Sequence, residues 1–190
     1  MRAPRDTCRG ACHHSLDMTE GLQDPLRHNT WATKELLTFC GDLPPDQLQA
    51  TATGTYGTIL STLQHIIGAE SRYRYRLSGM KPGWPREPEE TADVGELSRM
   101  AAELGGFWEE LATGPFDPDR TIDAAERDTG RKFEVKAGIL VAQVLNHGNE
   151  HRAQIYTILT TIGVEPPDLD GWMYGLATGR FRFTDGLPPE

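Results

Sequence analysis

The chain has 190 residues, of which 37% are hydrophobic and 25% charged. This length and composition suit one globular domain with its own core, not a disordered chain. The net charge of −9 argues against a general binder of nucleic acid or of anionic membranes. An odd count of three cysteines and the lack of a long apolar run exclude a disulfide-stapled secreted domain and a membrane span.

The first 17 residues carry positive charge and four metal-binding side chains, but no apolar core of a signal peptide. The spacing of Cys8, Cys12, His13 and His14 fits no common zinc pattern. We therefore expect residues 1–17 to be a disordered extension and the protein to be cytoplasmic. The folded domain is expected over residues 18–175, followed by a flexible tail over 176–190.

The first helix is predicted to start at Asp24, where a capping carboxylate precedes Pro25, and to end at Gly41. Its inner stripe repeats at steps of three and four residues and contains Leu26, Asn29, Thr33, Leu36 and Cys40. Asn29 is a polar exception on this stripe. Cys40 is interpreted as a core cysteine at the helix end, because the spacing places no base beside it.

Two further helices follow before the periodicity changes. The second is expected within residues 53–79, with the stripe Ile59, Leu63, Ile66, Glu70, Tyr73 and Leu77. The third is expected at about 92–111. Short alternating runs then flank the turn sequence at residues 128–130, which indicates a small β-hairpin or an extended loop over 120–135.

The fourth helix is expected at about 135–162, before Gly163 and a proline pair. In the tail, Trp172 and Tyr174 are expected to pack onto the other helices. Four long amphipathic segments predict an all-α fold, an up-and-down four-helix bundle with a small hairpin or extended loop between helices three and four.

The inner stripe of the fourth helix contains two histidines, His147 and His151. Positions four apart on a helix differ by about 40° in direction, so both imidazoles can point at one atom. Burying an imidazole without a hydrogen-bond partner costs about 1–3 kcal/mol of folding free energy. A divalent ion would satisfy both rings. The alternative is a pair of hydrogen-bonded core histidines near Asn146 and Gln154.

A metal site would need a third ligand from elsewhere. Of the remaining histidines, His28 lies on the first helix and His65 in the middle of the second. His65 sits roughly 120–140° from the centre of the apolar stripe of its helix, at 100° per residue. Periodicity alone therefore does not select it.

Three stretches of the sequence carry a resemblance to a known family: LRHNTWATKELLTFCGDLP, TLQHIIGAE, and NHGNEHRAQI followed by GVEPPDLDGWMYG. Over residues 22–175 they resemble the DinB-like (DNA-damage-inducible) metalloprotein family. The resemblance implies a four-helix bundle that binds a divalent metal through His65, His147 and His151. It also implies homodimers, and relatives that are thiol-dependent transferases or isomerases. Many relatives carry a further histidine where this chain has Glu150.

A set of imidazole ligands suits zinc or nickel, with iron and cobalt as the alternatives. Glu70 and Asn29 are candidates to orient the ring nitrogens that do not bind the metal. Glu70 could instead form an ion pair with Arg152 across the bundle. The residues that would act in catalysis beyond the metal ligands are not identified by the sequence.

The expected function is that of a metal-dependent thiol S-transferase or hydrolase acting on a small electrophilic molecule, with a low-molecular-weight thiol as a candidate partner. The alternative is a non-catalytic, stress-associated dimer in which the metal is structural. A fourth protein ligand, such as His28 or Glu70, would favour the structural role, because catalytic ions keep an open position. A nucleic-acid or membrane partner is not expected.

Overall fold

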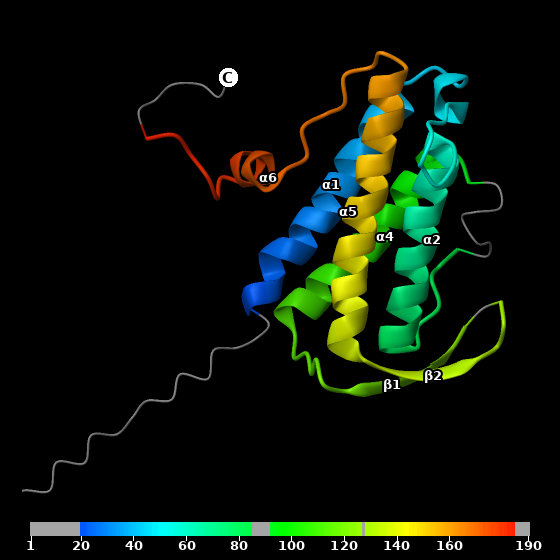
Figure 1. Ribbon diagram of the computed structural model, residues 1–190. Helices are drawn as coiled ribbons and strands as arrows, with labels where there is room; N and C mark the ends of the chain where they lie inside the picture. Colours follow the sequence, from blue (N-terminus) through cyan, green and yellow to red (C-terminus); the bar gives the residue numbers. More distant parts are fainter. Residues whose placement is uncertain (1–19, 85–91, 127, 185–190) are drawn as a thin grey trace, which may run out of the picture.

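The computed structural model describes residues 20–84, 92–126 and 128–184 (Figure 1). Within these ranges the protein is mostly helical, as predicted. Four long helices make up most of it: α1 (Gln23–Gly41), α2 (Ile59–Ser78), α4 (Val94–Thr113) and α5 (Ala137–Thr161). The shorter helices are η1 (Glu20–Leu22), η2 (Gln47–Gln49) and α6 (Gly171–Ala177). The expected extension over residues 1–17 lies outside the described residues.

The long helices bury one shared apolar core. α1 packs against α4 and α5, and α2 packs against α4 and α5. Each helix contributes fully buried side chains to this core, among them Leu36, Leu63, Leu104 and Ile155. Burying one such aliphatic side chain contributes about 1.5–3 kcal/mol. The three-and-four spacing of the apolar residues therefore explains why these segments are helical and why they associate.

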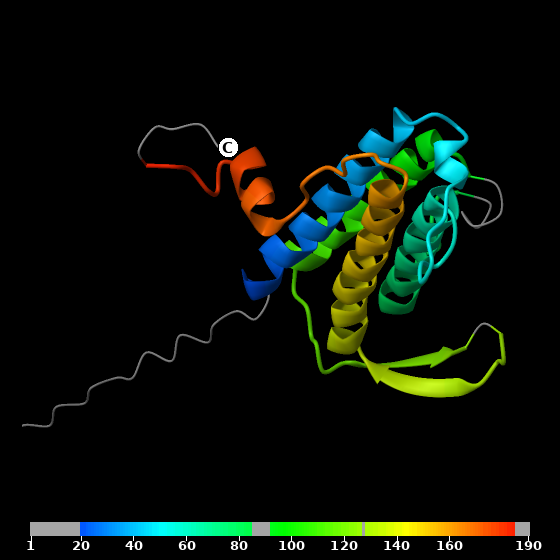
Figure 2. The ribbon, with the colours of Figure 1, turned by 45° about the horizontal axis from the view of Figure 1, so that its top comes forward.

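A β-hairpin lies at the end of the helices where α2 stops and α5 starts (Figures 1 and 2). Its strands β1 (Thr121–Ala125) and β2 (Lys132–Lys136) are antiparallel, with Thr121 opposite Lys136. Gly130 adopts a positive φ of 67° in the turn, a conformation that glycine adopts without steric cost. Of the two alternatives for residues 120–135, the hairpin is confirmed.

The helices α2 and α4 run in the same direction, so the prediction of strictly alternating helices is wrong for this pair. Gln64 donates to the carbonyl of Ala92 just before α4, while Arg74, further along α2, pairs with Glu103, further along α4. The last residue of α2, Ser78, and the first residue of α4, Val94, therefore lie at opposite ends of the helices, about 30 Å apart at 1.5 Å per residue. The intervening residues reach about 50 Å when extended. Alternation assumes short connections, and this one is long.

Two helix starts differ from the sequence prediction. α1 begins at Gln23, directly after η1, so Asp24 lies in the first turn and is not the capping residue. α2 begins at Ile59, because Thr58 is the cap and accepts a hydrogen bond from the backbone N–H of Ser61. Residues 50–58 therefore belong largely to a loop before α2, not to the helix.

The short helix α6 lies beside α1 (Figure 1). Tyr174 is buried there against the rings of His28 and Trp31. Trp172, in contrast, is 67% exposed and contacts Phe181, so the prediction that it packs onto the long helices is wrong. A seven-residue helix offers one buried face, and Tyr174 occupies it. In the described ranges, no helix combines the length and apolarity needed to cross a membrane.

Candidate metal centre

Three histidines from two antiparallel helices meet at one place. His65 comes from the middle of α2, and His147 and His151 come from the middle of α5. One ring nitrogen from each lies within 4.8 Å of the other two, and these residues form the only such potential metal-binding group in the described part of the chain. His147 and His151 are buried, whereas His65 is half-buried.

The closest contact in this group joins two ring nitrogens. Nε2 of His147 lies 3.0 Å from Nε2 of His65, so both nitrogens face the same small space. Without a cation, one of them must carry a proton to bond the other. Nδ1 of His147 is buried and has no hydrogen-bond partner. Two converging imidazoles and an unsatisfied ring nitrogen make a costly arrangement for a plain core, and they fit the donor set of a divalent ion.

Gln154 determines the tautomer of His151. Its side-chain oxygen accepts a hydrogen bond from the backbone N–H of Tyr56 at 3.0 Å and lies 3.0 Å from Nδ1 of His151. Because an amide oxygen only accepts, Nδ1 of His151 must carry the proton. Nε2 then keeps its lone pair, which is the form that binds a metal.

Two tyrosines flank the histidines. The ring of Tyr56 stacks on His65 with centroids 4.0 Å apart and planes 23° apart. The ring of Tyr73 meets His147 edge-on at 6.0 Å. Tyr56 is 52% exposed, so it lies between the histidine cluster and solvent. Periodicity selects neither tyrosine for the site, because it places Tyr73 on a core stripe and Tyr56 within the predicted second helix.

His147 is electrically suited to neutral coordination. Burial lowers the pKa of His147 to about 3, and the nearby rings of His151 and His65 and the charge of Arg72 contribute to that fall. A group with this pKa is uncharged at neutral pH, as a metal-binding imidazole must be.

A buried polar network lies next to the histidines on α5. Glu70 accepts hydrogen bonds from the side-chain nitrogens of Asn29 and Trp108, both at 2.9 Å. Arg152 donates to the side-chain oxygens of Asn29 at 2.9 Å and Thr33 at 3.0 Å. Asn29 therefore stands between Glu70 and Arg152 and bonds both. None of these bonds goes to an imidazole of the cluster, where Gln154 supplies the acceptor.

Burial outweighs the compensating interactions at both charged groups of this network. Burial raises the pKa of Glu70, and the hydrogen bonds from Asn29 and Trp108 and the charge of Arg152 oppose that rise. Burial likewise lowers the pKa of Arg152, while the charge of Glu70 opposes this change. The charge of Glu70 is thus the main compensation for the buried charge of Arg152. Glu70, in contrast, is compensated first by its two hydrogen bonds and then by Arg152.

Gly148, between the two histidines of α5, allows the network to reach that helix. A Cβ at this position would collide with the side-chain oxygen of Asn29 and would lie 2.8 Å from Nη1 of Arg152. The missing side chain therefore lets the polar groups of α1 approach the backbone of α5 next to His147.

A family model gives the relationship of this chain to known proteins. The model of the DinB family matches residues 18–180, most of the chain. The chain belongs to the DinB family. The resemblance identified in the sequence is thereby confirmed, and the match extends beyond residue 175, where the folded domain was expected to end. Among curated proteins, no sequence matches.

The other candidate ligands of this DinB-family chain lie elsewhere. His28 donates from Nε2 to the carbonyl of Leu169 at 2.8 Å. Cys40 is fully buried at the end of α1, and burial raises the pKa of its thiol to about 12. The interpretation of Cys40 as a core residue is consistent with this burial, because such a thiol is protonated and unreactive at neutral pH.

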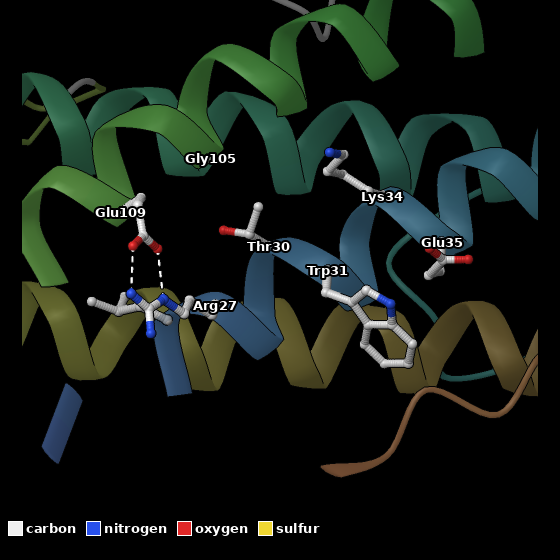
Figure 3. A pocket seen from close by; sticks show the side chains of 8 residues that line it. Arg27, Thr30, Trp31, Lys34, Glu35, Gly105 and Glu109 are labelled. Atoms are coloured by element: carbon white, nitrogen blue, oxygen red, sulfur yellow. Dashed lines mark hydrogen bonds and ion pairs between the residues drawn. The ribbon is translucent and has the colours of Figure 1, made fainter. Parts of the chain in front are cut away.

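A separate hollow of about 200 Å³ lies between α1 and α4. Figure 3 shows Arg27 and Glu109 bonded to each other on one side of it, with Thr30 between them and Trp31. It contains none of the three clustered histidines. Because the charge of Arg27 is paired with Glu109, this hollow has no evident role in the chemistry of the cluster.

Proposed function

We propose that the protein binds one divalent metal ion through His65, His147 and His151, within a four-helix bundle formed by α1, α2, α4 and α5. The observation that carries the proposal is the convergence of three ring nitrogens within 4.8 Å. The tautomer of His151 supports it, since Gln154 leaves the lone pair of Nε2 available. Zinc or nickel is the proposed ion, with iron or cobalt as the alternatives, because imidazole nitrogen suits all four.

We further propose that the site is catalytic. Among the described residues, the cluster offers three ligands. Three protein ligands with an open position are typical of catalytic ions. The two groups that could have closed the coordination sphere are engaged elsewhere: His28 with the carbonyl of Leu169, and Glu70 with Asn29 and Trp108. These contacts favour the enzyme over a protein with a structural metal.

The proposed reaction is the transfer of a thiol to a small electrophilic molecule, or the hydrolysis of that electrophilic molecule. When bound, the ion supplies a Lewis acid that lowers the pKa of a thiol or water at its open position. The chain supplies neutral imidazoles that hold the ion, and a hydrogen bond from His151 to Gln154 that fixes one ligand. Tyr56 lies over the cluster and shields it from water on that side. A cytoplasmic homodimer is part of the same proposal.

Metal content tests the first step. Tag-free protein purified without chelator or added metal is analysed by mass spectrometry, together with His65→Ala, His147→Ala and His151→Ala. The matched control is His28→Ala, which removes an imidazole bonded to Leu169. We expect about one ion per chain in the parent and the control, and loss of metal in the three variants. Circular dichroism checks that each variant is folded.

A parent protein that is metal-free and cannot be loaded would mean that the histidines are core polar residues, and the enzyme proposal would fall. If the metal is present, water exchange at the ion separates the two functions. A catalytic ion keeps exchangeable water, whereas a structural ion is saturated by protein ligands. Screening with low-molecular-weight thiols and electrophiles then follows, and light scattering measures the oligomeric state.

A further inference from the structure

The loop before α2 and the residue Gln154 are joined at the histidine cluster. We propose that Gln154 is a positioning residue that aligns ligands from both helices: it fixes the tautomer of His151 and, through Tyr56, the ring plane of His65. The proposal rests on the metal binding proposed above. It adds a residue and a loop, 50–58, to the parts of the molecule that determine metal affinity.

One oxygen atom of Gln154 serves two partners. It accepts hydrogen bonds from both the backbone N–H of Tyr56 and Nδ1–H of His151. Gln154 lies three residues after His151 on the same helix, so the contact to the imidazole is local. The contact to Tyr56 is not local, because it joins α5 to a loop 98 residues earlier in the chain.

The loop itself is held by hydrogen bonds of its own. The backbone N–H of Ile59 donates to the carbonyl of Ala50 at 3.2 Å and closes the loop at its base. Inside it, the hydroxyl of Thr55 donates to the carbonyl of Ala52 at 2.8 Å. Gly54 has a φ of 85°, which other residues rarely adopt. These features turn the chain so that Tyr56 points back at the cluster.

Tyr56, once held by this loop, contacts two of the three histidines. Its ring stacks on His65 at 4.0 Å and meets the ring of His151 edge-on at 5.4 Å. His65 comes from α2 and His151 from α5. One amide oxygen thus acts on a ligand of each helix, directly on His151 and through the loop on His65.

Loss of this acceptor would therefore affect two ligands at once. Without it, Nδ1–H of His151 has no partner on Gln154, and the tautomer with the proton on Nε2, which cannot bind a metal through that nitrogen, becomes more populated. The loop loses its tie to α5, and the stack on His65 loosens. Changes to the groups that orient metal ligands reduce metal affinity by about 10–100-fold, and we expect an effect of this size here.

The test compares three variants of the full chain. Gln154→Leu removes the acceptor at similar volume, and Gln154→Glu keeps an acceptor for both N–H groups. Gln143→Leu is the matched control, because Gln143 is an exposed glutamine on the same helix. Zinc affinity is measured by competition with a chromophoric chelator, the ligand geometry by the visible absorption of the cobalt-loaded protein, and the loop by hydrogen exchange at the amide of Tyr56.

We expect Gln154→Leu to bind zinc about 10–100-fold more weakly, to shift the cobalt absorption bands and to exchange the Tyr56 amide faster. Gln143→Leu should remain close to the parent in all three measurements. Gln154→Glu should keep the slow exchange of the Tyr56 amide and bind zinc at least as tightly as the parent, because a carboxylate accepts from both N–H groups and makes the imidazole a stronger ligand. If the parent binds zinc and Gln154→Leu binds it equally well with the same cobalt spectrum, the positioning role is wrong while the metal site stands. If the parent binds neither ion, both proposals fall.

Discussion

Replacement of Gly148 by alanine places a methyl group where the buried polar network meets α5. The added Cβ would overlap the side-chain oxygen of Asn29 and lie 2.8 Å from Nη1 of Arg152. Both neighbours are held in place, since they bond each other at 2.9 Å and Asn29 also bonds Glu70. Either the bond between Asn29 and Arg152 breaks or α5 moves away from α1.

The expected loss of unfolding free energy combines three contributions. Overpacking a filled core costs about 1–3 kcal/mol. A hydrogen bond to a charged group contributes about 1.5–3 kcal/mol. The higher helix propensity of alanine returns about 1 kcal/mol. We therefore expect Gly148→Ala to destabilise the metal-free protein by about 1.5–5 kcal/mol. Because His147 is the preceding residue, metal affinity should fall as well.

The matched control is Gly106→Ala. Gly106 lies in the interior of α4, is exposed, and has no atom within 4 Å of the position of an added Cβ. This change should stabilise the protein by about 0.5–1 kcal/mol through helix propensity alone. Urea unfolding of parent and variants, followed by circular dichroism, measures both. If Gly148→Ala is as stable as the parent, or gains stability like Gly106→Ala, the close packing at Gly148 does not limit stability and the reasoning is refuted.

Three further predictions concern charge, protonation and metal. Glu70→Gln should cost about 3–5 kcal/mol in urea unfolding, since it leaves the buried charge of Arg152 without its counter-charge; a neutral effect would contradict this. Burial raises the pKa of Cys40 to about 12 from 9.0. The unfolded state thus loses this proton first, and stability should fall as the pH rises from 9 towards 12; an equally steep fall in Cys40→Ala would contradict it. Excess zinc should raise the melting temperature of the parent, by mass action on the native state, and a chelator should reverse the rise; His151→Ala showing the same rise would place the zinc elsewhere.

Apolar periodicity was sufficient to predict where the long helices lie. The stripes of α1 and α5 contain Leu36 and Ile155, which are fully buried, and a three-and-four spacing of apolar residues is the pattern of a helix with one buried face. It was not sufficient for the direction of α4. That direction depends on how the chain returns after α2, and a connection rich in glycine and proline has no periodicity that would indicate its course.

Periodicity likewise predicts only part of the candidate site, because not all of its residues lie on an apolar stripe. His147 and His151 lie on an apolar stripe, where a polar residue is unusual and indicates a special role. His65 lies at the boundary between core and solvent, where a histidine is ordinary, and only the family resemblance selected it. Gln154 was visible as a neighbour of His151, but its bond to Tyr56 depends on a loop that returns from far away in the sequence.

The polar network has a consequence for how the helices recognise one another. Its members Asn29, Glu70, Trp108 and Arg152 come one from each of the four long helices. A slip of any one helix by about one turn, 5.4 Å, keeps its apolar stripe facing the core but moves its member of the network out of reach of the hydrogen-bond partners. Apolar side chains of similar size would tolerate such a slip. These four residues therefore select one alignment among many that bury similar apolar area, a contribution to structural uniqueness that a measurement of stability alone would miss.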